Sequence, residues 1–249
     1  GVEFMSTPFD FDAADYLDSM MNVYKISSSD LTNTPFIRHI AKKNKPIILS
    51  VGASNEEEIV RAVEEIKNKN KHQLTLLHCV LEYPTPLEDV NLNKIVSLKE
   101  KFSDVVIGYS DHTKPLESCD VIKTAFNLGA IVIEKHFTLD KTLSGNDHYH
   151  AMDPSDLKNM VESLEFMKKI RGSYDLKCLD TESSARLNAR RSIVAARDIR
   201  AGELITEDMI TFKRPGHGIS PDNVSEIIGK IASVNISEDT IIKFDVLSD

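Results

Sequence analysis

The chain has 249 residues, of which 41% are hydrophobic and 28% charged, and its formal net charge at pH 7 is -9. These proportions are typical of a folded protein with a sizeable core, and the negative charge without a basic stripe argues against a nucleic-acid partner. The longest apolar runs fall far short of the roughly 18 residues that cross a bilayer. Three cysteines without CxxC spacing indicate free thiols. We therefore expect a cytoplasmic protein that binds neither nucleic acid nor a membrane.

The first two thirds of the chain alternate between strand-like and helical segments. Short runs of strand-forming residues are followed by a polar turn and then by a segment with helical periodicity. The strand-like runs are VEFMST, VYKIS, PIILSVG, LTLLHCV, VVIGYS and IVIEKHF, which begin at residues 2, 23, 46, 74, 105 and 131. The helices are expected near residues 12–21, 32–43, 55–69, 91–101, 115–128 and 154–170.

This alternation predicts an α/β fold. Polar residues gather at the carboxyl ends of the predicted strands, which favours a (β/α)8 TIM-type barrel over an open, doubly wound sheet. A barrel of this type needs eight strands, whereas the sequence contains six βα units. We therefore expect a partial barrel domain over residues 1–171, from which the first two βα units are missing.

The remainder of the chain predicts a second, smaller domain. Residues 172–190 are polar and weakly patterned, as in a linker. Residues 191–249 contain the short runs SIVAA, MITFKR, ASVNI and TIIKF, separated by turn signals such as RPGHG. This pattern predicts a small β-rich domain.

Two histidines follow neighbouring predicted strands, in the segments GYSDHT and IEKHFT. Because alternate residues of a strand share a face, Ser110 should point the same way as His112, and Glu134 the same way as His136. Together with nearby carboxylates, two adjacent imidazoles could hold a divalent metal; the candidate carboxylates are Asp111, Glu134 and Asp147. The alternative is that each histidine is a satisfied core residue or a substrate contact.

A lysine lies within the strand-like run YKISSSD. Lys25 could bind an anion, form a Schiff base with a carbonyl substrate, or pack its stem and extend its charge to water. Hydroxyl groups of Thr7, Ser28 and Ser50 occupy similar strand ends. Several polar strand ends together favour an anion site.

Two loops complete the set of candidates. Tyr83, in the proline-containing segment EYPTP, could place an aromatic ring over a ligand. The polar segment SGNDHYHAMDP follows the strand that carries His136, and we interpret it as a lid or substrate loop. Within it, His148 and His150 are expected to be exposed rather than to act as ligands.

Taken together, these segments resemble one family of enzymes. STPFD, YKISSSD, PIILSVGAS, EYPTPLEDVNL, IGYSDHT, GAIVIEKHFT and GNDH occur in the order found in the sialic acid synthases, a family that includes N-acetylneuraminate, legionaminic acid and pseudaminic acid synthases. The tail RSIVAARDIRAGELITEDMITFKRPGHGI is similar to their antifreeze-like SAF domain, a β-clip fold. The resemblance covers nearly the whole chain.

The resemblance implies an activity: the condensation of phosphoenolpyruvate with an N-acyl amino sugar such as N-acetylmannosamine, with release of phosphate. It implies a divalent metal, Mn²⁺ first and Mg²⁺ or Co²⁺ as alternatives, held by His112 and His136. Residues matched to phosphoenolpyruvate contacts are Thr7, Lys25, Ser28, Ser50 and Ser110. Residues matched to the surroundings of the sugar and metal are Tyr83, Asp30, Glu134 and Asp147, and the three carboxylates among them are candidate catalytic groups. In a domain-swapped homodimer, Arg214 would reach the sugar site of the partner.

Two departures from the family leave other functions open. Leu81 stands where family members usually have Ser or Asn, and the family's first strands have no counterpart here. The chain could therefore be a non-catalytic fragment, or a subunit that binds sugar or assists assembly. A lysine-dependent aldolase that uses Lys25 is a further alternative.

Overall fold

The computed structural model describes residues 1–249, which divide into two compact units, Gly1–Gly172 and Ser173–Asp249. Each unit is described by itself. Neither contains a helix that is both long and apolar enough to span a membrane.

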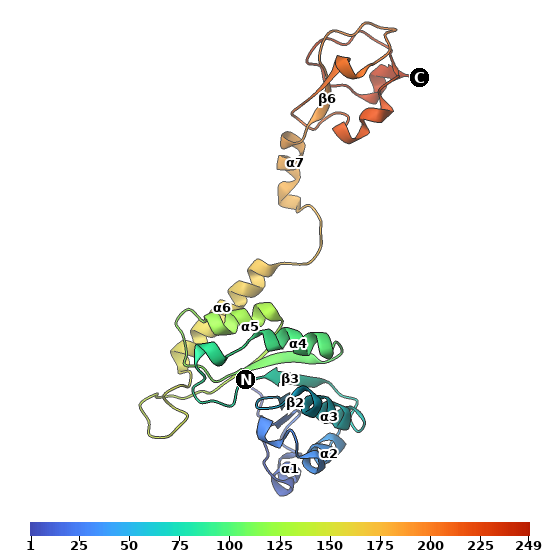
Figure 1. Ribbon diagram of the computed structural model, residues 1–249. Helices are drawn as coiled ribbons and strands as arrows, with labels where there is room; N and C mark the ends of the chain where they lie inside the picture. Colours follow the sequence, from blue (N-terminus) through green and yellow to red (C-terminus); the bar gives the residue numbers. More distant parts are fainter. The chain divides into compact units, whose positions relative to one another are not determined.

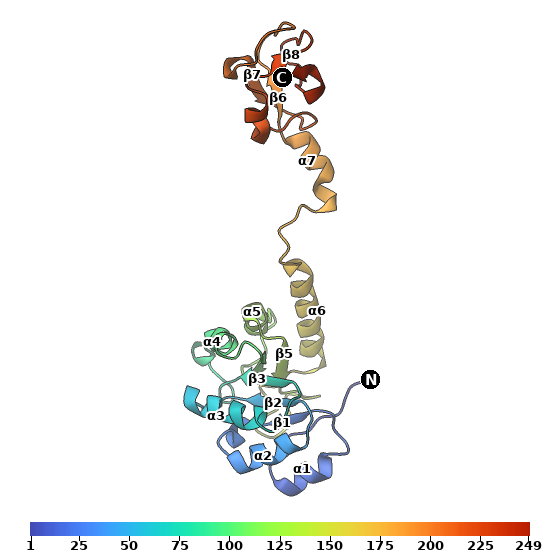
Figure 2. The same ribbon diagram turned by 90° about the vertical axis from the view of Figure 1, so that its right-hand side faces the viewer.

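The first unit is built on a curled parallel sheet of five strands, half of a barrel, with helices along its outer side (Figures 1 and 2). The strands follow one another in chain order: β1 Tyr24–Ile26, β2 Ile47–Ser50, β3 Leu74–His78, β4 Val106–Asp111 and β5 Val132–Lys135. The helices are α1 Phe11–Leu17, α2 Thr34–Lys42, α3 Glu56–Lys67, α4 Asn93–Lys101, α5 Asp120–Leu128 and α6 Pro154–Arg171, with 3₁₀ turns at Ser28–Asp30 and Leu87–Asp89. The predicted α/β barrel-type fold is confirmed.

One predicted strand is wrong. Residues 2–7 have no regular secondary structure, although their sequence is strand-like. A strand needs a hydrogen-bonded neighbour, and β1, at the edge of the sheet, pairs only with β2. Side-chain contacts hold the segment instead: the Asn22 amide donates to Glu3 at 2.7 Å, and the Ser6 backbone amide lies 3.0 Å from the Met21 sulfur.

Local sequence explains where the helices begin. Asn55 and Glu58 form a reciprocal capping box at the start of α3, and Asp153 and Asp156 form another at the start of α6, where Pro154 occupies the first turn. Such a cap contributes about 1 kcal/mol. These two helices therefore begin within one residue of their predicted starts, 55 and 154, whereas the helix predicted from residue 115 begins at Asp120.

The strands of the sheet have two different faces. Apolar side chains of alternate residues, such as Tyr24, Leu49 and Ile107, pack against the helices in the main core. Burial of each large apolar side chain contributes about 1.5–3 kcal/mol. The intervening residues, which include Lys25 and Ser110, point to the opposite side, the concave face. The sheet thus separates a packed outer face from a polar concave face.

The second unit is the β-rich domain expected from the sequence. Strand β6 Ser192–Ala195 pairs with β7 Ile210–Lys213, and β8 Ile231–Ala232 pairs with β9 Leu247–Ser248, both antiparallel. Single bridges join Ile199 to Ile236 and Val194 to Ile241, so the runs ASVNI and TIIKF form fewer ladder bonds than predicted. The 3₁₀ turns are Asp180–Glu182, Glu207–Met209, Pro221–Glu226 and Phe244–Val246, and the buried core includes Ile193, Ile205, Ile227 and Ile242.

Part of the segment expected to be a linker is helical. Helix α7, Ser183–Ala189, belongs to the second unit. The Gly216 amide donates to the Leu187 carbonyl oxygen at 2.8 Å, and a Cβ atom on Gly216 would lie only 2.9 Å from the Arg190 Cβ. The RPGHG loop therefore approaches α7 closely because residue 216 has no side chain.

Candidate active site

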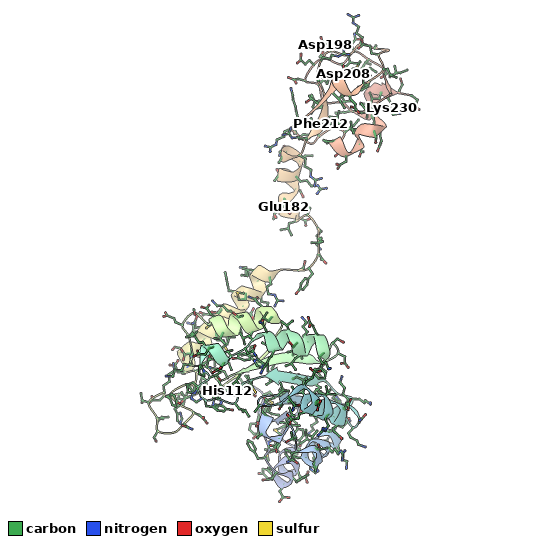
Figure 3. All side chains as sticks on the ribbon, in the orientation of Figure 1. His112, Glu182, Asp198, Asp208, Phe212 and Lys230 are labelled. Carbon is green, nitrogen blue, oxygen red and sulfur yellow. The ribbon has the colours of Figure 1, made fainter.

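His112 and His136 lie side by side at the carboxyl ends of β4 and β5. Asp111 is in register with Lys135, so the next residue of each chain segment is a histidine. The two imidazole centroids are 5.4 Å apart. Figure 3 shows His112 among the loops that follow the strands, where barrels of this type place their chemistry.

The His112 ring is held in one tautomer. Its Nδ1 lies 2.6 Å from the Val80 carbonyl oxygen, an acceptor, so Nδ1 carries the proton and donates it. Burial lowers the pKa of His112, and the nearby His136 ring acts in the same direction, against the opposing effect of the Val80 hydrogen bond. The ring is therefore neutral at pH 7, with the lone pair of Nε2 available to a ligand.

Tyr83 packs over the two histidines. Its ring centroid is 4.2 Å from that of His112 and 5.7 Å from that of His136. The Tyr149 hydroxyl donates to the Tyr83 carbonyl oxygen at 3.3 Å and so joins the two loops. Burial raises the pKa of Tyr83, which keeps its hydroxyl protonated at neutral pH. Leu81, in the same loop, is 40% exposed.

A chain of polar contacts crosses the concave face. The Ser110 hydroxyl donates to Glu134 Oε1 at 2.6 Å, and Glu134 Oε2 lies 3.4 Å from the Lys25 Nζ. Lys25 is only 6% exposed. Ser110 Oγ also lies 3.5 Å from His112 Nε2. A buried cation, a carboxylate and the histidine pair thus form one connected group.

Two further serines lie on the same face. Ser28 Oγ accepts a hydrogen bond from the Gly52 amide at 2.9 Å and contacts the Cys79 sulfur at 3.1 Å. Ser50 is buried, and its hydroxyl has no hydrogen-bond partner. An unsatisfied buried polar group costs about 1–3 kcal/mol. The Ser50 hydroxyl is therefore a candidate for contact with a bound ligand.

The expectation that His148 and His150 are exposed is wrong. His150 is fully buried and His148 half-buried. Backbone hydrogen bonds join Met152 to His136 and to Thr138, each at 2.8 Å, and fold the intervening loop back over the strand end. His148 Nδ1 lies 2.7 Å from the Thr138 hydroxyl. No local sequence pattern reports such a closure.

Asp111 does not face the histidines, so its role as a candidate metal ligand is wrong. Its odd position in β4 directs it to the outer face, where Oδ2 pairs with Lys135 Nζ at 2.8 Å. Oδ1 accepts from the Tyr109 hydroxyl at 3.1 Å and from the Thr113 amide at 2.9 Å. Lys135 also donates to the Thr113 carbonyl oxygen. These bonds satisfy the pair without any ligand.

Three further predicted site residues make no hydrogen bond or ion pair with the connected group or with the two concave-face serines. Thr7 is half-buried in the irregular segment before α1, and Asp30 Oδ1 accepts from the Asn33 amide at 3.2 Å next to the start of α2. Arg214 is exposed in the second unit. Its loop is fixed by Ser192, whose hydroxyl donates to the Pro215 carbonyl oxygen at 2.6 Å.

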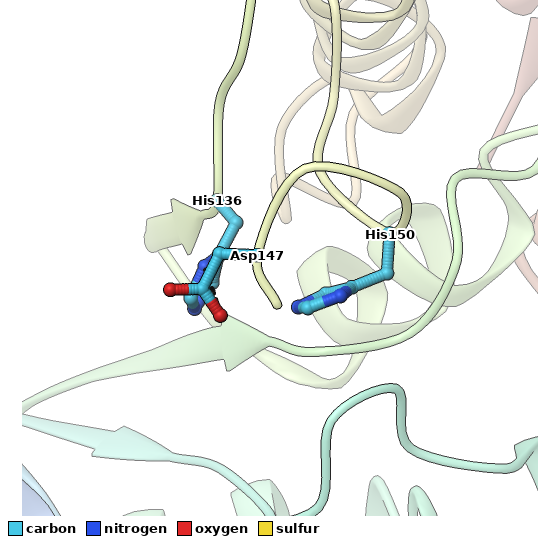
Figure 4. A group of neighbouring side chains, drawn as sticks. All are labelled: His136, Asp147 and His150. Carbon is cyan, nitrogen blue, oxygen red and sulfur yellow. Dashed lines mark ion pairs between the residues drawn. The ribbon is translucent and has the colours of Figure 1, made fainter. Parts of the chain in front are cut away.

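The donor groups at the strand ends suit a divalent metal. Candidate ligand atoms of His136, Asp147 and His150 lie within 4.8 Å of one another (Figure 4). The His136 Nδ1 is 3.9 Å from Asp147 Oδ1, and the neutral His112 ring is adjacent. Imidazole nitrogens combined with a carboxylate bind first-row divalent ions. The buried ring nitrogens of His150 make no hydrogen bond of ordinary geometry, which also favours a metal site here.

Comparison with known proteins places this arrangement in a family. The NeuB family model matches residues 1–175, and the SAF domain model matches residues 190–247. The chain is 42% identical to N,N'-diacetyllegionaminic acid synthase of Campylobacter jejuni, over 97% of this chain and 72% of that protein. It is 37% identical to a pseudaminic acid synthase of the same species, over 95% and 68%.

A solved structure agrees with both units. The putative spore coat polysaccharide biosynthesis protein E of Chromobacterium violaceum superposes with a TM-score of 0.87 at 28% identity, covering 100% of this chain and 74% of that one. The resemblance noted from the sequence motifs is therefore confirmed. The chain belongs to the NeuB family and ends in a SAF domain.

Proposed function

We propose that the protein condenses phosphoenolpyruvate with N-acetylmannosamine or a related N-acyl amino sugar, forming a nonulosonic acid and phosphate. The observation that carries the proposal is the connected group on the concave face, in which Lys25, Glu134 and the histidine pair lie together. Relatives named legionaminic and pseudaminic acid synthases support the substrate class. A cytoplasmic location remains a prediction of this proposal.

His112 and His136 would hold a divalent ion, with Mn²⁺ the first to test and Mg²⁺ or Co²⁺ as alternatives. The ion would polarise the aldehyde oxygen of the open-chain sugar as a Lewis acid. The Val80 carbonyl fixes the orientation of the His112 ring for this role. Tyr83, whose ring packs at a tilt against His112, would form one wall of the sugar site.

Phosphoenolpyruvate would bind deeper on the concave face. Lys25 supplies a buried positive charge for its carboxylate or phosphate. The Ser50 hydroxyl, which has no partner in the protein, would donate to the same anion, and Ser28 and Ser110 supply neighbouring hydroxyls. Thr7 is a further proposed contact from the segment before α1.

The reaction balances with groups on the concave face. Phosphoenolpyruvate C3 forms a bond to the aldehyde carbon, whose oxygen takes up a proton and becomes a hydroxyl. Water adds to C2, and phosphate leaves as the C2–O bond breaks; the two protons of the water are lost, which leaves a ketone at C2. Glu134 is the favoured base for the water, because Ser110 and Lys25 hold its two oxygens in a fixed orientation. Asp147 and Asp30 are the alternative catalytic carboxylates.

The proposal includes a homodimer in which the second unit of one copy caps the barrel of the other. Arg214 would then reach the partner's sugar site. Its loop suits this role because Ser192 holds it from both sides, donating to the Pro215 carbonyl oxygen and accepting from the Gly218 amide at 2.8 Å.

The aldolase alternative is less well supported. A Schiff-base lysine is activated by an apolar or cationic environment. Lys25 instead faces the carboxylate of Glu134 at 3.4 Å. This environment suits anion binding.

The test measures phosphate release from phosphoenolpyruvate with N-acetylmannosamine and with the amino-sugar precursors of legionaminic and pseudaminic acids, with Mn²⁺ and with a chelator. Metal-dependent release with one sugar is the expected result and names the substrate. Trapping of a pyruvate adduct by borohydride, unaffected by chelator, would favour the aldolase. Sugar binding without phosphate release would favour a binding subunit.

A further inference from the structure

We propose that His150 is an additional protein ligand of the divalent ion, together with His136 and Asp147. This inference rests on the proposed metal site and extends it to a loop residue that the sequence motifs did not indicate. Figure 4 shows the His150 ring directed towards His136 and Asp147.

The first argument is the combination of burial and missing partners. His150 is 0% exposed, and neither ring nitrogen makes a hydrogen bond of ordinary geometry, although the ring interacts weakly with the Asn146 backbone. In folded proteins nearly all buried polar groups are satisfied, and a native exception indicates an absent ion, water or ligand. The buried histidine on the outer face contrasts with this: His78 Nε2 donates to the Val90 carbonyl oxygen at 2.8 Å.

The second argument is the proximity of other donors. Candidate ligand atoms of His136, Asp147 and His150 lie within 4.8 Å of one another. An ion about 2.1 Å from each donor requires neighbouring donors about 3 Å apart. Binding therefore requires the donors to approach one another by up to about 2 Å, and the exposed Asp147 side chain can contribute to this movement.

Backbone hydrogen bonds fix the loop that carries His150. Backbone bonds from Met152 to the His136 carbonyl and from Thr138 to the Met152 carbonyl place residue 150 beside the end of β5. The ring contacts His136, with centroids 5.2 Å apart, and packs against Tyr149 at 5.0 Å. An anchored ring whose nitrogens face two other donors is suited to coordination.

The competing explanation is that His150 only packs against Tyr83 and Tyr149. His150→Phe preserves an aromatic ring and removes both nitrogens, so it separates packing from coordination. His150→Ala removes both properties. His148→Gln is the matched control, because it replaces a histidine of the same loop and keeps a group able to bond the Thr138 hydroxyl.

The experiment titrates the chelator-treated full chain and each variant with Mn²⁺ by calorimetry, and records the visible absorption of the Co²⁺ forms. We expect the Mn²⁺ dissociation constant to rise by more than about 100-fold in both His150 variants, because loss of a ligand costs more than loss of a group supporting a ligand, and we expect a weaker or shifted Co²⁺ spectrum. His148→Gln should bind as the unaltered protein does. Without metal, His150→Phe should unfold at the same or a higher denaturant concentration.

The outcomes separate this inference from the proposed function. If His112→Ala loses Mn²⁺ affinity and His150→Phe retains it with an unchanged Co²⁺ spectrum, His150 is a packing residue and only this inference fails. If the unaltered protein binds neither Mn²⁺ nor Co²⁺, the metal site itself is wrong and both proposals fail. The same conclusion follows if His112→Ala and His150→Phe both bind the ions as the unaltered protein does.

Discussion

The two sides of the sheet differ in how completely the protein satisfies its own polar groups. On the outer face, Asp111 and Lys135 are almost fully buried and bonded to each other, to Tyr109 and to Thr113. On the concave side, the Ser50 hydroxyl of β2 and both ring nitrogens of His150, in the loop after β5, make no hydrogen bond of ordinary geometry. Burial alone therefore does not identify a site, whereas burial of polar groups that lack hydrogen-bond partners does.

The ion pair between Asp111 and Lys135 on the outer face also fixes the positions of the two histidines on the concave face. Asp111 directly precedes His112, and Lys135 directly precedes His136, so the ion pair holds the two strand ends in register. We interpret the outer face as the scaffold and the concave face as the reactive surface. Substitutions on each face test this division.

The largest effect is expected on the concave face. His112→Ala should lower metal-dependent phosphate release by more than about 100-fold, because loss of a ligand costs more than loss of a group supporting a ligand. The fold should persist, since the polar contacts of the ring are one hydrogen bond to Val80 and a long contact with Ser110. Rates at saturating Mn²⁺ and a circular dichroism spectrum measure both properties. Full activity would remove His112 from the site.

Substitutions on the outer face should lower the stability of the fold rather than the activity. Asp111→Leu leaves the Lys135 ammonium buried without its partner, and we expect a loss of about 3–5 kcal/mol in unfolding free energy. Denaturant titration measures it. The double variant Asp111→Leu, Lys135→Met should recover most of the loss, because no unpaired charge remains. A loss below about 1 kcal/mol in the single variant would show that the pair is not a scaffold.

Lys25 distinguishes substrate binding from metal binding on the concave face. Lys25→Met should raise the KM for phosphoenolpyruvate by about 10- to 100-fold, the value of one charge-assisted hydrogen bond. The Mn²⁺ dissociation constant should stay within a few fold. A reversed pattern, with metal affinity lost and KM unchanged, would contradict the assignment of Lys25 to the anion.

Substitution of Arg214 tests whether a partner subunit caps the sugar site on the concave face. Arg214→Ala should raise the KM for the sugar by about 10-fold and leave that for phosphoenolpyruvate nearly unchanged. Lys213→Ala, a neighbouring charge that pairs with Asp239, is the control. An unchanged sugar KM would count against the cap formed by a partner subunit.

The smallest expected effect is on the pH dependence of stability, which involves His78 on the outer face. Burial lowers the pKa of His78, whereas the unfolded chain has an ordinary histidine pKa near 6.5. As the pH falls below about 6.5, the unfolded state binds a proton that the folded state does not, so stability decreases. His78→Gln should flatten the dependence of unfolding free energy on pH between 7 and 5.5. An equal slope in both proteins would contradict this.

The alternation of residues along each strand correctly predicted which side chains share a face of the sheet. Period-two spacing correctly grouped Ser110 with His112 and Glu134 with His136, and the same rule would have assigned Asp111 to the opposite face. It did not predict His150, whose position depends on backbone bonds between Met152 and the end of β5. It also predicted a strand at residues 2–7, because local pattern reports propensity and not a pairing partner.

The most direct test of the central claim is mass spectrometry of the product formed by the 249-residue chain from phosphoenolpyruvate and an N-acyl amino sugar, with phosphate measured in the same reaction. We predict one nonulosonic acid for each phosphate released, with Mn²⁺ present, and neither product after chelation. Phosphate without the sugar acid, or a sugar acid formed equally well in chelator, would contradict a metal-assisted condensation on the concave face.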